Sequence, residues 1–154
     1  MQKFIGGIGC FWDETKYKGV PGIISTECGY CGGKNSTVSY EQVCAGDTEH
    51  IEVVNVQFDP KKISYEEVTR LFFKFHDPTT SNRQGPNIGY QYRSEIFYNT
   101  NEEKKIAEKV LNEVNKKLFL DQTEHLQLLC VLYFLHKLVH NSLLNFYLHN
   151  IRIQ

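Results

Sequence analysis

The segment from Ile51 to Phe58 constrains the fold more than any other part of the sequence. It is rich in β-branched residues and stops at Asp59-Pro60, a combination that is typical of a β-strand. Side chains alternate between the two faces of a strand, so Glu52 shares the more apolar face with three large neighbours, Val54, Val56 and Phe58. The sequence therefore predicts a core strand that carries one carboxyl group among apolar side chains.

Further strand and helix patterns lie on both sides of this strand. Strands are predicted from Lys3 to Ile8, from Ile23 to Tyr30 and from Arg93 to Tyr98. Helices are predicted from Cys10 to Lys18, from Ser64 to Phe75 and from Thr100 onward. This order predicts an α+β fold of the ferredoxin-like split βαβ type, with a mixed sheet and helices packed on one face.

Short local patterns fix where the helices begin. Ser64 with Glu67 forms a capping box, and Thr100 with Glu103 has the same spacing. A further helix start is predicted at Ser39, with Gln42 as its capping partner. The segment from His76 to Tyr92 is predicted as a long loop, and loops of that length in small domains are often functional.

The size and charge of the chain exclude several classes of protein. Its 154 residues suit one domain, and its formal net charge of -1 argues against nucleic acid as a partner. An odd number of cysteines, five, argues against a secreted disulfide framework. The N-terminus has no room for a signal peptide before a chemistry-like motif at Gly9. We expect a monomer in the cytoplasm, where thiols are reduced.

The amino-acid composition of the last part of the chain differs from that of the rest. We therefore expect residues 1–117 to form the folded domain and residues 118–154 to form an atypical tail. The stretch from Leu126 to Leu148 is rich in Leu, Phe, Tyr and His and is predicted to form one or two helices. Lys137 and Asn141, together with His136 and His140, argue against a membrane-spanning segment there.

Cys10 is the first residue that points to chemistry. It follows a glycine turn at the predicted start of a helix, where free backbone N–H groups and the helix dipole lower a thiol pKa. Phe11 and Trp12 follow at once and can wall an apolar pocket beside the sulfur. The alternative is a small buried cysteine flanked by core rings.

Glu52 is the second candidate. A carboxyl on an apolar face is costly to ionise, so its pKa is expected to rise, which makes it a proton donor near neutrality. The alternative is an exposed carboxyl at the strand end or one paired with Arg93. Tyr40 and Tyr92 are candidate donors to a polar substrate oxygen, although core packing is the more common role for any single tyrosine.

Three more cysteines and a histidine form a spaced cluster, namely Cys28, Cys31, Cys44 and His50. Their spacing is similar to that of some zinc sites, so a zinc-binding structural module is an alternative. A thioredoxin-like pair at Cys28 and Cys31 is a further alternative. That pair ends a predicted strand rather than starting a helix, so it lacks the dipole that activates such motifs.

Taken together, the motifs resemble those of the peptide-methionine (S)-S-oxide reductases, the MsrA family. The resemblance covers about residues 3 to 115, in the family's order. It rests on Gly9-Cys10-Phe11-Trp12, on Gly29-Tyr30-Cys31-Gly32-Gly33, on Ser39 to Gly46, on His50 to Val54, on Ile63 to Glu66, on His76 to Thr79, on Asn82 to Gly85 and on Gly89 to Ser94.

The resemblance implies roles for individual residues. Cys10 would be the nucleophile that attacks the sulfoxide sulfur and becomes a sulfenic acid, and Glu52 would protonate the sulfoxide oxygen. Substrate-binding roles fall to Phe11, Trp12, Tyr40, Tyr92 and Asn87. The substrate would be methionine (S)-sulfoxide, free or in proteins. Thioredoxin would restore the thiols, and no metal or organic cofactor is required.

The sequence departs from the family pattern at four places. The first helix has Thr15 where the family usually has Glu, and the segment to Pro21 is one residue short. Asn87 stands where the family often has Asp, and Cys31 is an uncommon choice within its glycine-rich run. From about Leu118 onward none of the family's usual terminal motifs is present, so the thiol that resolves the sulfenic acid is unassigned among Cys28, Cys31, Cys44 and Cys130. The alternative function is an impaired homologue that only binds methionine or methionine sulfoxide peptides.

Overall fold

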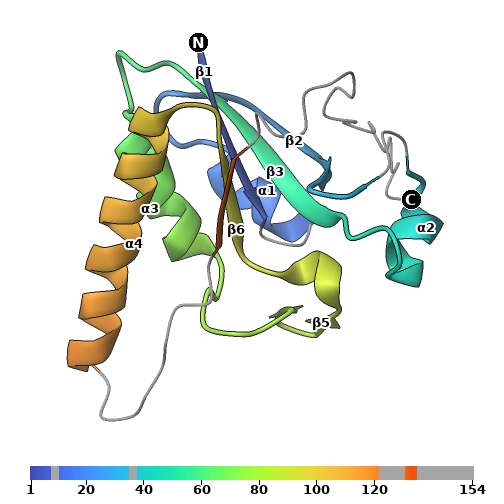
Figure 1. Ribbon diagram of the computed structural model, residues 1–154. Coiled ribbons are helices and arrows are strands. Elements are labelled where there is room, and N and C mark those ends of the chain that lie inside the picture. The colour runs from blue at the N-terminus through green and yellow to red at the C-terminus, as the bar shows by residue number, and fades with distance from the viewer. Residues whose placement is uncertain (8–10, 35–37, 122–130, 135–154) are drawn as a thin grey trace.

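The structure is a computed structural model that describes residues 1–7, 11–34, 38–121 and 131–134. Within these residues the main sheet has the strand order β2-β3-β1-β6-β7 (Figure 1). The strands are β1 (Gln2–Gly7), β2 (Ile23–Cys31), β3 (Ile51–Phe58), β6 (Glu95–Tyr98) and β7 (Val131–Phe134). Neighbours are antiparallel except for β6 and β7, which are parallel. The predicted mixed sheet is confirmed.

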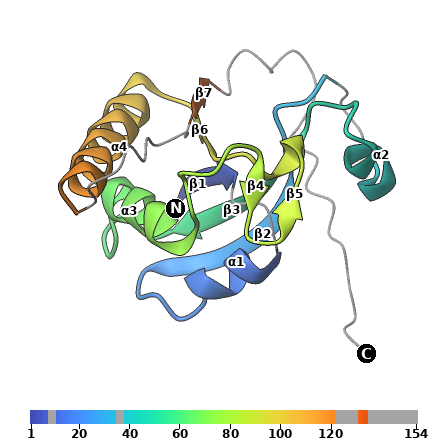
Figure 2. The ribbon, with the colours of Figure 1, turned by 90° about the horizontal axis from the view of Figure 1, so that it is seen from below.

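Three helices of the described part of the chain cover one face of this sheet. They are α1 (Phe11–Tyr17), α3 (Tyr65–Phe75) and α4 (Asn101–Asp121), and they follow one another along the sheet from β2 to β6 (Figure 2). The main core lies beneath them. It includes Phe4 of β1, Val54 of β3, Phe72 of α3 and Val110 of α4. Burial of these apolar side chains stabilises the fold at roughly 25 cal/mol per Å² removed from water.

Local caps explain where α3 and α4 begin. The Ser64 hydroxyl accepts a hydrogen bond from the backbone N–H of Glu67, whose carboxylate accepts one from the Ser64 N–H in return. The hydroxyl of Thr100 accepts from the backbone N–H of Glu103 in the same way. Both predicted helix starts are therefore confirmed.

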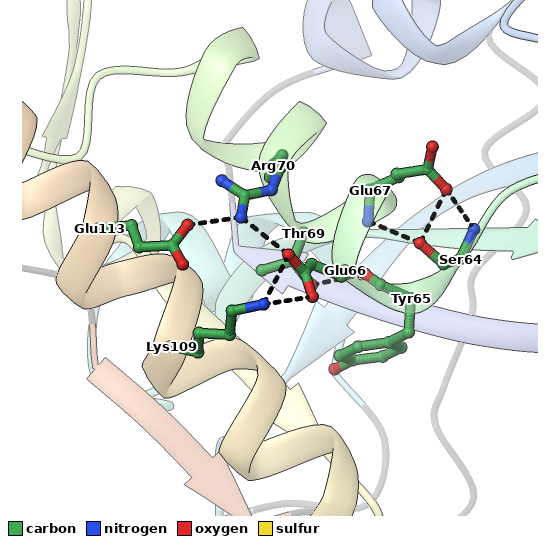
Figure 3. A network of polar contacts seen from close by, with 8 residues as sticks. All are labelled: Ser64, Tyr65, Glu66, Glu67, Thr69, Arg70, Lys109 and Glu113. Atoms are coloured by element: carbon green, nitrogen blue, oxygen red, sulfur yellow. Dashed lines mark hydrogen bonds and ion pairs between the residues drawn. The ribbon is translucent and has the colours of Figure 1, made fainter.

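An exposed ionic network joins α3 to α4 on the surface (Figure 3). Glu66 lies at its centre and accepts from Arg70 of the same helix at 2.8 Å and from Lys109 of α4 at 3.0 and 2.9 Å. Arg70 also pairs with Glu113 of α4. These contacts fix the two helices relative to each other, while the apolar contacts below them supply most of the stability.

The opposite face of the sheet carries a second, smaller cluster. Its members are Ile5, Cys31, Ile51, Val53 and Phe97. Because neighbouring residues of a strand point to opposite faces, this cluster and the main core alternate along β1, β3 and β6. Both faces of the sheet are therefore buried near its centre.

The long predicted loop contains structure that the sequence did not reveal. A hairpin of β4 (Arg83–Gln84) and β5 (Asn87–Ile88) is followed by a 3₁₀ helix, η1 (Tyr90–Tyr92), and β6 then begins at Glu95 rather than at Arg93. The helix predicted at Ser39 is confirmed as α2 (Tyr40–Ala45), including its capping box with Gln42. It lies on the opposite side of the molecule from α3 and α4 (Figure 1).

The C-terminal part differs from its prediction. Residues 131–134 form β7, which pairs with β6, so the helix predicted across this stretch is wrong there. The run Val-Leu-Tyr-Phe favours a strand once β6 offers an unpaired edge, and this tertiary contact decides the outcome. Helix α4 runs through the expected boundary at residue 117. Among the described residues, no helix has the length and apolar character needed to cross a bilayer.

Candidate active site

Glu52 is the second residue of β3, and its side chain lies on the helix-covered face, as the alternation predicts. It is half-buried, and burial raises the pKa of its carboxyl to about 7. The expected alternative, a pair with Arg93, is wrong, because Arg93 pairs with Glu95 instead. Glu52 is therefore a half-buried acid that still holds its proton in about half of the molecules at pH 7.

The phenols of Tyr40 and Tyr92 lie close to this carboxyl. Tyr40 is the first residue of α2, and Tyr92 is the last residue of η1. A hydrogen bond from the Tyr40 hydroxyl to Cys44, together with the charges of Cys44, Tyr92 and Glu52, raises the pKa of Tyr40 to about 12. The structure thus brings three of the predicted site residues together, although α2, β3 and η1 are far apart in the sequence.

Tyr40 faces solvent, and its side chain is 45% exposed. Tyr92 is half-buried. A phenol hydroxyl can donate a hydrogen bond, so both side chains can bind an oxygen placed beside Glu52. The arrangement can therefore bind a polar oxygen and protonate it, which is what a general acid site requires.

Asn87 lies in β5, where its backbone pairs with Gln84 of β4. The hairpin packs against η1, the element that carries Tyr92. Asn87 is half-buried. It is placed beside the phenol cluster through η1, and among the described residues no direct contact links it to Glu52.

The remaining predicted site residues fall at the start of α1. Cys10 lies outside the described residues. Phe11 and Trp12 are the first two residues of α1, and their side chains also lie outside the described part. Helix α1 packs against β2 and β3, so it begins on the face of the sheet that carries Glu52.

The loop that precedes β3 is held by close packing of Gly33 against His50. A Cβ atom at Gly33 would lie 1.9 Å from Nδ1 of His50, so a side chain does not fit there. The backbone N–H of Lys34 donates to the carbonyl of Thr48, which closes the same loop. This packing fixes the entry to β3 two residues before Glu52.

The described thiols differ sharply in environment. Cys28 donates to the carboxylate of Glu14, while Cys31 is buried and burial raises its thiol pKa to about 12. Cys44 is exposed, and Cys130 lies outside the described residues. Cys28 and Cys31 point to opposite faces of β2, which argues against the zinc alternative. Within the described ranges, no three His, Cys, Asp or Glu side chains gather in a metal-binding arrangement.

Sequence reasoning missed two features of this region. Tyr30 lies directly opposite Glu52 across the β2–β3 ladder. Arg93 and Glu95 form a buried ion pair on the other face of the sheet. The first depends on the register of β2 against β3, which is set by the pairing of the whole strands. The second depends on side-chain direction, which the sequence does not encode locally.

A profile of the family described as peptide methionine sulfoxide reductase matches residues 2–136. The match extends past Leu118, so the expectation that the resemblance ends there is wrong for these residues. A curated relative from Pelagibacter ubique, peptide methionine sulfoxide reductase MsrA, is 54% identical over 119 residues, which are 77% of this chain and 81% of the relative. The relative of the same name from Sulfolobus acidocaldarius is 50% identical over 74% of this chain and 65% of its own length.

A solved structure is similar over nearly the whole chain. Reduced Mxr1 from Saccharomyces cerevisiae has a TM-score of 0.76 and 31% identity, over 95% of this chain and 90% of Mxr1. Mxr1 has also been solved in complex with Trx2; that structure has a TM-score of 0.55 and 24% identity, over 82% of this chain and 74% of that one.

Proposed function

The chain belongs to the peptide methionine sulfoxide reductase family, and from this premise we propose that it reduces methionine (S)-sulfoxide, free or in proteins, to methionine. The reaction uses a cysteine thiolate and a proton donor and needs no metal. A single observation carries the proposal most directly. The carboxyl of Glu52 is half-buried beside two phenols, and its pKa is raised to about 7.

The reacting groups are Cys10 and Glu52. The Cys10 thiolate attacks the sulfoxide sulfur while Glu52 delivers its proton to the sulfoxide oxygen. The oxygen is transferred to Cys10, which becomes a sulfenic acid, and methionine leaves as the thioether. The elevated pKa of Glu52 supports its part in this step, because an ordinary glutamate has already lost its proton at neutral pH.

The other site residues bind the substrate. The hydroxyls of Tyr40 and Tyr92 donate to the sulfoxide oxygen and hold it next to Glu52. Phe11 and Trp12 wall the pocket for the methyl group, and Asn87 orients its neighbours through the hairpin. The position of η1 supports the role of Tyr92, since it brings that phenol to the start of β3.

A second thiol and an external reductant complete the cycle. The second thiol condenses with the sulfenic acid, which forms a disulfide and releases water, and thioredoxin reduces that disulfide by exchange. Exposure favours Cys44 among the described thiols, because an exposed thiol is accessible to thioredoxin, whereas Cys31 is buried and Cys28 is only partly exposed. Cys130 is the remaining candidate.

Several wider expectations belong to the same proposal. Residues 1–117 form the catalytic domain and residues 118–154 form the tail of a cytoplasmic monomer that needs neither a membrane nor nucleic acid. The fold is of the ferredoxin-like split βαβ type. The strand order β2-β3-β1-β6, with antiparallel neighbours throughout, supports this assignment.

The test is a reductase assay with the two separated sulfur epimers of methionine sulfoxide and dithiothreitol as reductant. We expect turnover of the S epimer alone and loss of turnover in Cys10→Ser. Cys28→Ser is the matched control, because its hydroxyl can still donate to Glu14 and dithiothreitol replaces any resolving thiol. Binding of a methionine sulfoxide peptide without turnover by the unaltered chain would instead establish the impaired homologue.

A further inference from the structure

Tyr30 lies beside Glu52 on the flank that faces the edge of the sheet. The two residues are direct partners in the antiparallel β2–β3 ladder, so their side chains lie on the same face with Cβ atoms about 4.5–5.5 Å apart. In the described part of the chain, β2 pairs only with β3 and forms an edge of the sheet. Water that approaches the carboxyl along this edge therefore meets the Tyr30 ring first.

The groups around Glu52 come from every element packed against it. Strand β2 supplies Tyr30, helix α2 supplies Tyr40 and Cys44, and η1 supplies Tyr92. Helix α1 carries two further carboxylates, Asp13 and Glu14, which pair with Lys16 and Lys18. No cation among the described residues pairs with Glu52, so exclusion of water governs its protonation.

We propose that Tyr30 is a positioning residue whose ring shields the Glu52 carboxyl from water at the edge of the sheet. This inference rests on the proposed function, because it concerns how the acid of that reaction is kept protonated. The ring, rather than the hydroxyl, does the shielding. A phenyl ring removes water from its neighbours over its whole area, whereas a hydroxyl would bring a polar partner to the carboxyl.

The surroundings of Tyr30 are consistent with a neutral shield. The side chain is half-buried, and its burial, followed by the charge of Glu52, raises the pKa of the phenol well above its usual range. The hydroxyl therefore stays protonated wherever the enzyme works and adds no charge next to the acid. Tyr40, by contrast, is largely open to solvent and cannot replace Tyr30 in this role.

The test measures the pKa of Glu52 directly, by a carbon-13 NMR titration of side-chain carboxyls in the full chain, together with the pH profile of kcat. Tyr30→Phe keeps the ring, so the Glu52 pKa is expected to stay at about 7. Tyr30→Ser opens the edge and lowers it by about one pH unit. The alkaline limb of the kcat pH profile shifts to lower pH by the same amount. Activity therefore falls about fivefold at pH 7 and recovers at lower pH.

Tyr30→Thr is the second variant, since a β-branched residue preserves the strand if Tyr30→Ser does not fold. Ile24→Ser is the matched control, because it shortens another large side chain of β2 and leaves the profile unchanged. An unchanged Glu52 pKa in the folded Ser or Thr variant overturns the proposal, as does a lowered pKa in Tyr30→Phe. The titration needs no turnover. If the unaltered chain is inactive but the Glu52 pKa is lowered in Tyr30→Ser, the result refutes the proposed function and still supports the shielding role of Tyr30.

Discussion

Two buried glutamates lie on opposite faces of the same sheet and are held in different ways. Glu52 lies on the helix-covered face beside Tyr30, Tyr40 and Tyr92, and burial raises its pKa to about 7. Glu95 is only 4% exposed on the other face, where burial is the larger effect and leaves its pKa raised, although the ion pair with Arg93 opposes the rise.

The difference between the two lies in the neighbour. A buried carboxyl with a cation at hydrogen-bond distance is held in an ion pair that joins parts of the structure. Arg93 also donates to the carbonyl of Tyr90 and stacks on its ring, so the Glu95 pair holds η1 in place. A buried carboxyl with only phenols around it keeps its proton and can give it away. The sheet thus separates an ion-paired structural carboxyl group from one that is placed to donate a proton.

The largest effect that this comparison predicts is on catalysis. Glu52→Gln removes the proton donor and keeps the shape, so kcat should fall by about 10²–10⁴-fold. Glu95→Gln is the matched change on the other face and should retain most of the activity. Steady-state assays with dithiothreitol and methionine sulfoxide check this. An equal loss of kcat in both variants would contradict the different roles assigned to Glu52 and Glu95.

The next effect is on stability. Arg93→Met leaves Glu95 buried without its cation and should cost about 3 kcal/mol of unfolding free energy at neutral pH. Without Arg93 the pKa of Glu95 rises further, so the loss should shrink on acidification as the carboxyl takes up a proton. Urea denaturation at pH 5 and pH 7.5 measures both. The double variant Arg93→Met/Glu95→Met should recover part of the loss, and a double variant no more stable than the single one would argue against the pair.

A smaller effect concerns the pH dependence of stability. The folded pKa of Glu52, about 7, exceeds the unfolded value of 4.5, so its stabilising contribution is fully present below pH 4.5 and is lost as the pH rises through 7. Between pH 5 and pH 7.5 the native chain should therefore lose about 2 kcal/mol relative to Glu52→Gln. Denaturation curves of both proteins at the two pH values give this difference, and parallel pH dependence would contradict it.

The smallest effect belongs to a third glutamate that is exposed. Hydrogen bonds from Arg70 and Lys109 lower the pKa of Glu66, so its contribution is present above pH 4.5 and is lost as the pH falls through the lowered value, opposite in direction to that of Glu52. Glu66→Gln should change stability least of all, and added salt should reduce the change further. If Glu66→Gln lost as much unfolding free energy as Arg93→Met, exposure would not explain the different contributions of these glutamates to stability.

Local patterns in the sequence predicted the parts of this molecule that depend on local geometry. The face of Glu52 followed from the two-residue period of a strand, and the starts of α2, α3 and α4 followed from side chains that bond the backbone three residues away. These rules need no knowledge of the rest of the fold. The proximity of Tyr40 and Tyr92 to Glu52 came instead from the family resemblance.

The features that the sequence did not predict depend on contacts between residues that are far apart in the chain. The hairpin β4–β5 and η1 have two or three residues each and exist because they pack on other elements. The choice of Glu95 over Glu52 as the partner of Arg93 depends on which face each side chain points to. Tyr30 was missed because its importance comes from its position opposite Glu52 in the β2–β3 ladder. The register that places the two residues opposite each other is set by the pairing of whole strands.

The close packing of Gly33 against His50 links the evolution of the two positions. Any β-carbon at residue 33 collides with the imidazole ring of His50, which would have to leave its buried position just before β3 and its acid. A smaller residue at position 50 would remove this collision, so a change at one position alters which residues fit at the other. A design that places Glu52 and its strand in another scaffold should therefore include Gly33 and His50 together.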